Sequence, residues 1–295
     1  MTNASPAHVP VMLDQVVRWL DPKPGMTIVD GTLGGGGHAR ALAERIAPNG
    51  LLIALDRDPN AIAAAERNLA GMPVKLAGAN FCELPEVLEQ VEISQVDGIV
   101  LDLGVSSDQL ADTQRGFSFA AEGPLDLRFD PTRGEPAGRL VNRLNAQHLA
   151  DLIYRYGEER YSRQIARAIV ARRREKPIET AAELAELVRR CVPRRRGAER
   201  IDPATRTFQA LRIAVNDELK SLEIALRRMP GCLAPQARLV VISFHSLEDR
   251  LVKEAFRDDD RLEPLTRKPI RPDPDEVARN PRSRSAKLRV AERTD

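Results

Sequence analysis

The sequence predicts an α/β protein in which a doubly wound parallel sheet is interrupted by an all-helical insertion. In the first third of the chain, short apolar segments alternate with helical patterns that are apolar on one face. About a hundred residues with helical periodicity follow, and an apolar strand then returns near residue 240. Apolar strands separated by amphipathic helices are typical of a parallel sheet that helices cover on both faces.

Four strands are expected before the insertion, at residues 26–30, 51–56, 73–77 and 97–102. Three of them end in an acidic residue, which is Asp30, Asp56 or Asp102. Asp58 and Pro59 follow the second strand and are suited to the N-cap and the first position of a helix.

The middle of the chain has a different character. Residues 112–138 are rich in Gly, Pro, Arg and Asp and show no clear periodicity, whereas residues 146–192 are helical throughout. A long helix is expected from Asp202 to Leu226, because apolar residues recur there at helical spacing. A strand at 238–244 and a helix capped by Ser246 complete the pattern.

These patterns predict two domains. A cofactor-binding domain is expected at 1–111 and 209–295, with a basic, flexible tail from about residue 264. A helical domain is expected at 112–208, inserted after the fourth strand.

Charge is distributed unevenly along the 295 residues, although the net charge is only +2. Residues 155–212 carry 16 Lys and Arg against eight Asp and Glu, and residues 264–295 carry nine against five. Such segregation indicates that one side of the protein meets a polyanion. The alternative interpretation is a solvated helical face, since Arg is a good helix former.

Several classes of protein are disfavoured by the composition. No apolar run approaches the roughly 20 residues that span a bilayer, and no signal-peptide pattern opens the chain, so a cytoplasmic protein without a membrane partner is expected. Three scattered cysteines predict no disulfide framework, and four histidines show no metal-ligand spacing. His245 follows the last strand, where it either faces the ligand site or is a satisfied structural histidine.

A nucleotide pocket is predicted from the glycines at 34–37 and from Asp56. Ligands of an open α/β sheet bind beyond the carboxyl ends of the strands, where glycines admit the ligand and a helix start offers free N–H groups. Asp56 is placed to accept hydrogen bonds from both ribose hydroxyls. The spacing fits an adenosine-containing cofactor, but it does not separate nicotinamide from S-adenosylmethionine, and a glycine-rich turn without a ligand is the remaining alternative.

Ten motifs then decide between the cofactors. They are HVPVM (8–12), DGTLGGGGH (30–38), DRDP (56–59), LDLGVSS (101–107), RGFSF (115–119), PLDLR (124–128), DPTRG (130–134), YGEER (156–160), RTFQA (206–210) and SFHSLEDR (243–250). With these motifs the chain resembles the bacterial 16S ribosomal RNA (cytosine-N4)-methyltransferases of the RsmH (MraW) family. The resemblance implies a Rossmann-like class I methyltransferase sheet, S-adenosylmethionine as cofactor, and methylation of the exocyclic N4 amine of a decoding-centre cytidine.

The resemblance also implies site residues. The family's cofactor contacts fall on Gly36, Gly37, His38, Asp56, Phe81, Asp102 and Gln109. The family resemblance implies no metal. The partner it implies is 16S rRNA, within the small ribosomal subunit or a late assembly intermediate; monomer and homodimer both stay open.

The catalytic group must activate the N4 amine of cytosine. Cytosine N4 is a poor nucleophile, so an enzyme must position it and accept hydrogen bonds from the amine. The Asp/Asn-Pro-Pro-aromatic tetrapeptide of many amino methyltransferases is absent at 102–105, which read DLGV. Asp102 is therefore the main candidate, with Ser106 and Ser107 as alternatives. Attack through a cysteine at carbon 5 is disfavoured, because no cysteine follows the fourth or fifth strand.

RNA contacts are predicted from charge and position. The candidates are arginines of the insertion, namely Arg133, Arg163, Arg167, Arg172, Arg173, Arg174, Arg194, Arg195 and Arg196. Two rival functions remain: a nicotinamide-dependent oxidoreductase, which leaves the basic insertion unexplained, and an RNA-binding assembly factor with a vestigial cofactor pocket.

Overall fold

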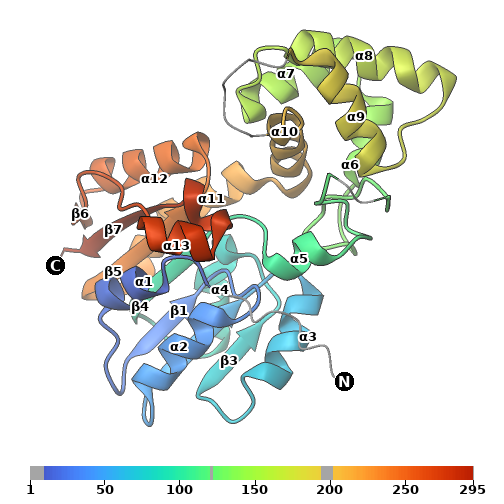
Figure 1. The fold of residues 1–295 in the computed structure, drawn as a ribbon. Coiled ribbons are helices and arrows are strands. Elements are labelled where there is room, and N and C mark those ends of the chain that lie inside the picture. The colour runs from blue at the N-terminus through green and yellow to red at the C-terminus, as the bar shows by residue number, and fades with distance from the viewer. Residues whose placement is uncertain (1–9, 120–121, 194–201, 295) are drawn as a thin grey trace. The chain divides into compact units, whose positions relative to one another are not determined.

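The chain folds into two units, a sheet unit and a helical unit (Figure 1). A computed structural model describes residues 10–119, 122–193 and 202–294. The sheet unit comprises Met1–Ser106 and Leu219–Asp295, and the helical unit comprises Ser107–Glu218. The helical unit thus begins five residues before the predicted boundary at 112 and ends ten residues after the one at 208.

The sheet unit contains seven strands in the order β3-β2-β1-β4-β5-β7-β6. The strands are β1 (Thr27–Asp30), β2 (Leu51–Leu55), β3 (Val74–Ala77), β4 (Val96–Asp102), β5 (Leu233–Ser243), β6 (Leu262–Pro264) and β7 (Lys287–Arg293). Strands β1 to β5 are parallel, and β7 is antiparallel to both of its neighbours. The predicted doubly wound sheet is confirmed, with an antiparallel edge added to it.

Helices cover both faces of this sheet because its strands are apolar on both sides. Ile53 and Ile99 point to one face, where they pack with α4 (Leu84–Gln90), α11 (Glu218–Arg228) and α12 (Ser246–Asp258). Leu52 and Val100, one residue along the same strands, point to the other face. There they pack with α1 (Leu13–Leu20), α2 (Gly37–Ile46) and α3 (Pro59–Asn68). This alternation follows from the two-residue period of a strand.

The C-terminal region is a structural part of the sheet, so the predicted flexible tail from about residue 264 is wrong. Strand β7 lies between β5 and β6, with Val290 paired to Val240 and Ala291 paired to Pro264. Leu288 and Val290 are fully buried. The proline-rich segment before β7 contains α13 (Pro274–Arg279) and a short 3-10 helix, Pro281–Ser285.

The helical unit contains α5 (Ser107–Ala111), α6 (Ala137–Arg143), α7 (Ala146–Gly157), α8 (Ser162–Glu175), α9 (Ala181–Cys191) and α10 (Thr205–Asn216). Its core is built from fully buried residues of the last four helices, such as Ile153, Ile165, Leu184 and Leu211. The capping box of Thr180 and Glu183 opens α9 as predicted.

The predicted long helix over 202–226 is two helices. α10 ends at Asn216, and Asp217 adopts a left-handed conformation with φ of 51°. The cause is tertiary: the buried Asn216 side chain donates to the Leu127 carbonyl at 2.7 Å and accepts from the Phe129 amide at 2.7 Å. These bonds hold the end of α10 against the irregular segment of the helical unit.

None of the helices in the part of the chain that the structure describes has the length and apolar character needed to span a membrane.

The buried position of β7 gives a stability test. We expect Leu288→Ala to lower the free energy of unfolding by about 2–5 kcal/mol, because it leaves a cavity beside β5. Lys268→Ala, at an exposed position of the same C-terminal region, is the control and should change it by less than about 0.5 kcal/mol. Urea denaturation measures both variants, and equal stabilities would contradict the structural role of β7.

Candidate functional site

The candidate site lies at the carboxyl edge of the sheet, where the strand order reverses. Strands β1 and β4 are neighbours although β2 and β3 lie between them in sequence, and Asp30 pairs with Val100. Asp102 therefore ends β4 two residues beyond the end of β1. Asp56 directly follows β2, on the other side of β1. Three carboxylates thus gather where an open α/β sheet binds its ligands.

The segment after β1 is fixed to both neighbouring strands, β4 and β2. The Gly31 amide donates to the Val100 carbonyl at 2.9 Å, and the Leu33 amide donates to the Leu55 carbonyl at 2.9 Å. Glycine fits at 31 without displacing its neighbours, because a Cβ there would lie 2.5 Å from Leu101 Cδ2 and 3.2 Å from Phe81 Cβ. A side chain at 31 would force Leu101 and Phe81 to shift.

Hydrogen bonds within this segment orient two of the carboxylates. Thr32 donates its amide to Asp30 Oδ1 at 3.0 Å, and its hydroxyl accepts from the Asp102 amide at 2.6 Å. The Gly34 amide donates to Asp56 Oδ2 at 2.8 Å. Asp56 Oδ1 accepts from the Asp58 amide at 2.8 Å, and each oxygen keeps a second lone pair for a ligand hydroxyl.

The start of α2 offers backbone N–H groups beside these acids. Gly36 is the N-cap residue with φ of 77°, and no side chain caps the helix. The first N–H groups of an α-helix have no partner within the helix. His38 is buried on the first turn; its Nε2 donates to the Val11 carbonyl at 3.0 Å, and its Nδ1 lies 3.7 Å from Asp102 Oδ2. The helix start therefore lies beside Asp102.

Burial makes this group of carboxylates electrostatically unusual. Desolvation raises the pKa of Asp30 to about 7, partly offset by the Thr32 amide. Desolvation, with Asp30 and two glutamates nearby, raises the pKa of Asp102 well above its usual value. The pKa of Asp56 is also raised, mainly by desolvation. Asp30 Oδ2 and Asp102 Oδ1 are buried and accept no hydrogen bond from any residue that the structure describes.

Unsatisfied acidic oxygens of this kind fit a cationic, hydrogen-bonding ligand. A positive charge within about 4–6 Å favours the ionised carboxyl and removes the cost of burying it. Asp56 can accept from a diol, and the half-buried ring of Phe81 on the 3-10 helix Phe81–Glu83 offers an apolar surface. A sulfonium, an amino group, a ribose and a purine, the parts of S-adenosylmethionine, match this set of groups.

The structure brings most of the predicted cofactor residues together. Gly36, Gly37, His38, Asp56, Phe81 and Asp102 all belong to the sheet unit. Gln109 lies on α5 in the helical unit, where its side chain is buried. Sequence reasoning passed over Asp30 and Thr32 as site residues. Asp30 could have been found, because it ends β1 as Asp102 ends β4.

His245 caps α12 with one ring nitrogen, whereas its buried Nε2 makes no hydrogen bond to any residue that the structure describes. Its Nδ1 accepts from the Glu248 amide at 3.3 Å, and its Nε2 lies 3.1 Å from Glu248 Oε1. Glu248 Oε2 in turn accepts from the Phe244 amide at 2.8 Å. His245 is thus the N-cap of α12, so the prediction of Ser246 in that position is wrong by one residue.

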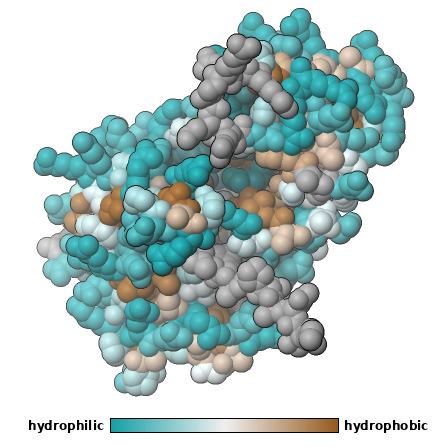
Figure 2. Space-filling model, viewed as in Figure 1, coloured by the Kyte–Doolittle hydropathy of each residue, from teal (hydrophilic) through white to brown (hydrophobic). Residues whose placement is uncertain are grey.

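Three of the predicted RNA-contacting arginines form a stripe on α8. Arg163, Arg167 and Arg174 are exposed and lie within about 40° of one another around the helix, away from the buried Ile165 and Ile169. The surface over α8 is largely hydrophilic in Figure 2. From Arg163 to Arg174 the stripe extends about 17 Å along the axis of α8.

The other predicted RNA-contacting arginines do not belong to this stripe and differ in how free their side chains are. Arg133 is 83% exposed, on a turn held by Asp130. Arg172 pairs with Glu183, and Arg173 donates to the Val141 carbonyl, so both are partly committed within the protein. Residues 194–196 lie outside the described residues.

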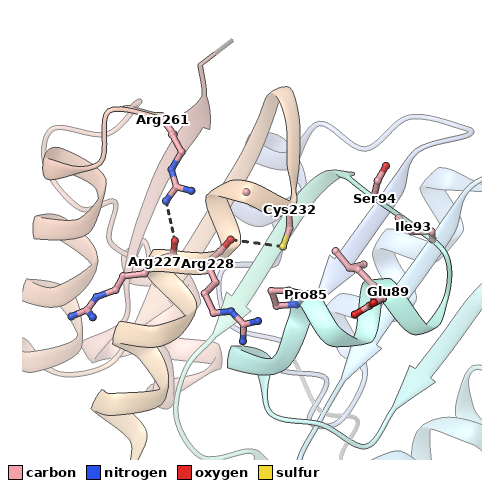
Figure 3. A pocket seen from close by; sticks show the side chains of 10 residues that line it. Pro85, Glu89, Ile93, Ser94, Arg227, Arg228, Cys232 and Arg261 are labelled. Atoms are coloured by element: carbon pink, nitrogen blue, oxygen red, sulfur yellow. Dashed lines mark hydrogen bonds between the residues drawn. The ribbon is translucent and has the colours of Figure 1, made fainter.

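A cavity of about 540 Å³ lies at the opposite, amino edge of the sheet, between the ends of α4 and α11 (Figure 3). Two of its three arginines are engaged: Arg228 pairs with Glu86 at 2.6 Å, and Arg261 pairs with Asp259 at 2.7 Å. Arg261 also donates to the Arg227 carbonyl (Figure 3). The carboxyl edge, with its unsatisfied acids, is therefore the better candidate site.

Comparison with known proteins gives full-length matches. A sequence profile of the MraW methylase family matches residues 5–294. The chain is 50% identical to the ribosomal RNA small subunit methyltransferase H of Rhodopirellula baltica, over 99% of this chain and 93% of that protein. It is 49% identical to the protein of the same name from Thermomicrobium roseum, over 98% and 94% of the two chains. Both units are thus included in the matches.

The buried acid of β1 gives a pH-dependent test. Burial raises the pKa of Asp30 from its ordinary value of 3.8 to about 7, so the ionisation of Asp30 destabilises the fold progressively as the pH rises between these values. We expect Asp30→Asn to match the wild type near pH 4 and to exceed its unfolding free energy by up to about 4 kcal/mol at pH 8. Urea denaturation without ligand at both pH values measures this; a difference that does not change with pH would contradict it.

Proposed function

The chain belongs to the MraW methylase family, and from this premise we propose that it methylates the exocyclic N4 amine of a cytidine in 16S ribosomal RNA. The proposed methyl donor is S-adenosylmethionine, and the proposed substrate is the small ribosomal subunit or a late assembly intermediate in the cytoplasm. The observation that carries the proposal is the near-full-length similarity to relatives named ribosomal RNA small subunit methyltransferase H. The unsatisfied acids at the strand ends support the choice of donor.

The sheet unit supplies the proposed donor site. S-adenosylmethionine, when bound, supplies an electrophilic methyl group on a sulfonium. Asp56 would accept hydrogen bonds from the ribose hydroxyls, Phe81 would pack against the purine, and the N–H groups of Gly37 and His38 would face the amino-acid end of the donor. The Gly36 amide already donates to the Leu33 carbonyl, so Gly36 would contribute by leaving room for the ligand. Gln109 is the one proposed contact from the helical unit. Asp30 joins this set, because its free Oδ2 is stabilised by a nearby cation.

Asp102 is the proposed catalytic residue. The N4 lone pair is delocalised into the cytosine ring, so an acceptor for the amine hydrogens is needed to localise it. Asp102 Oδ1 is buried and accepts no hydrogen bond from the described residues, whereas its amide is fixed by Thr32 and its Oδ2 lies beside His38. The carboxylate is therefore oriented and keeps unused capacity to accept hydrogen bonds. Ser106, in the loop after β4, is the weaker alternative, as is Ser107.

The helical unit is the proposed RNA-recognition domain. The α8 stripe of Arg163, Arg167 and Arg174 fits the phosphates of an RNA backbone, and the exposed Arg133 is a further proposed contact. Arg194, Arg195 and Arg196 remain proposed contacts from charge alone. Aromatic residues make up only 4% of the chain, so stacking on bases contributes little.

The function is tested directly by mapping modified nucleotides. Mass spectrometry of 16S rRNA from cells with and without this protein should show one N4-methylated cytidine that disappears in its absence. The purified protein should restore this methylation in vitro, measured as transfer of tritium from labelled cofactor to small subunits that lack it. Subunits that bind the protein but receive no label would favour the assembly factor over the enzyme.

Asp102 is tested by substitution. We expect Asp102→Ala to lower kcat by at least about 100-fold, because the amine loses its acceptor in the transition state. Glu89→Ala, in the cavity at the amino edge, is the control and should keep the wild-type rate. Label transfer measures both, and calorimetric titration with adenosylhomocysteine reports whether the site is intact. Wild-type turnover by Asp102→Ala would remove Asp102 from the mechanism.

The α8 stripe is tested by salt dependence. Replacing Arg163, Arg167 and Arg174 with Ala should reduce the slope of log affinity against log salt concentration by about 2–3, since each phosphate contact contributes about 0.7–0.9. Arg190→Ala, an exposed arginine that pairs with Glu186 on α9, should leave the slope nearly unchanged. The measurement is binding to unmethylated small subunits over a range of KCl concentrations. An unaltered slope in the triple variant would exclude the stripe as an RNA contact.

A further inference from the structure

The segment between β6 and β7 crosses the carboxyl edge of the sheet. The Leu265 amide donates to the Val290 carbonyl, and Ile270 bridges to Leu288, so the segment first runs antiparallel to β7 towards its start. β7 begins at Lys287, which pairs with Ser243 at the carboxyl end of β5. Residues 271–286 therefore lie at the same edge as Asp30 and Asp102. We call residues 266–286 the crest loop.

Hydrogen bonds join the crest loop to the candidate site. Glu276 on α13 accepts from the Met12 amide at 2.6 Å, at the start of α1. The preceding carbonyl, that of Val11, accepts from His38, which lies beside Asp102. Glu276 also contributes to the raised pKa of Asp102. The crest loop is thus a wall of the acid-lined site.

The loop is fixed by its own side chains as well. Ser283 is fully buried, and its hydroxyl donates to the Asn280 carbonyl at 2.8 Å. Asp273 caps α13 by accepting from the Glu276 amide at 2.7 Å. Thr266 Oγ1 accepts from the Val290 amide at 3.0 Å. These bonds fix the backbone of the crest loop, so its exposed side chains start from defined positions.

The surface of the crest loop is cationic. Six basic residues of the crest loop are exposed: Arg267, Lys268, Arg271, Arg279, Arg282 and Arg284. Of its three acids, Asp273 is used as a helix cap and Glu276 holds α1. Among the residues that the structure describes, no carboxylate pairs with Arg267, Lys268, Arg271, Arg279 or Arg284. Some other exposed arginines of the sheet unit do have such partners, as in Arg257 with Asp258 and Arg261 with Asp259.

We propose that the crest loop is a second RNA-binding surface, which holds the sugar–phosphate backbone next to the reacting nucleotide from the sheet unit itself. The proposal rests on the proposed function, since it takes RNA as the substrate. Unpaired guanidinium groups bind phosphates without breaking an ion pair of the protein. The loop contains no aromatic residue, so it offers phosphate contacts and no stacking platform.

The position of the surface gives it a mechanistic purpose. Methyl transfer requires the target amine to be held in line with the donor, and small displacements lower the rate strongly. The crest loop is joined to the start of α1 by the hydrogen bond between Glu276 and the Met12 amide. Phosphate contacts made by this loop would therefore hold the RNA close to the reacting atoms. Loss of these contacts should therefore weaken RNA binding and also lower the rate of methyl transfer.

The test compares two double variants of equal charge change. Arg271→Ala/Arg284→Ala removes two cations of the crest loop, and Lys253→Ala/Arg257→Ala removes two exposed cations of α12. Binding to unmethylated small subunits is measured at several KCl concentrations. The crest-loop variant should bind about tenfold more weakly near 0.1 M salt, with a slope shallower by about 1.4–1.8. The α12 variant should match the wild type.

Two controls separate the possible failures. Adenosylhomocysteine should bind both variants as it binds the wild type, which shows that the donor site is intact. If the wild type methylates small subunits and the crest-loop variant binds them with unchanged affinity and slope, the crest loop is not an RNA surface. If the crest-loop variant loses affinity only for phosphatidylserine vesicles, the surface meets a membrane and the proposal is overturned. If the wild type transfers no methyl group to the subunits, the proposed function itself fails.

Discussion

The arrangement of the site depends on one constraint, which is the burial of two carboxyl groups at the ends of neighbouring strands. Asp30 and Asp102 each keep one buried oxygen that accepts no hydrogen bond from the described residues. Desolvation holds the pKa of both well above the usual range, so the folded protein pays for their ionisation. A bound cation reverses this balance, because it stabilises the ionised forms. Binding of a positively charged donor would therefore lower the free-energy cost of ionising these two buried acids.

The backbone around these acids is arranged to keep them in place. Gly31 lets the chain pass over Leu101 and Phe81, and Thr32 then bonds to both strand ends. On the far side, α13 reaches α1 through Glu276, and α1 reaches α2 through His38. The C-terminal residues therefore serve both the sheet, through β7, and the site, through the crest loop. A flexible tail could do neither.

Local patterns in the sequence predicted the strands β1 to β4, the glycine loop and the acids Asp56 and Asp102, because these depend on neighbouring residues. The errors arose where distant residues decide the structure. β7 pairs with β5, about fifty residues earlier, and its proline-rich approach resembles a linker. The break after Asn216 depends on bonds to Leu127 and Phe129, which no periodicity reveals. Asp30 was visible as a strand end, but only its missing partner marks it as a site residue.

Net charge alone does not locate a polyanion-binding surface in this chain; the pairing of its cations does. The cavity at the amino edge is rich in arginine, yet Arg228 and Arg261 already have carboxylate partners. Binding a phosphate at either of these two arginines requires a salt bridge to be broken, and the gain is then small. On the α8 stripe and the crest loop, most exposed cations have no such partner among the described residues, so counterion release favours RNA directly. A near-neutral overall charge is thus compatible with RNA binding. Many of the acidic residues pair with basic residues inside the protein or lie at the donor site, so they do not neutralise these two cationic surfaces.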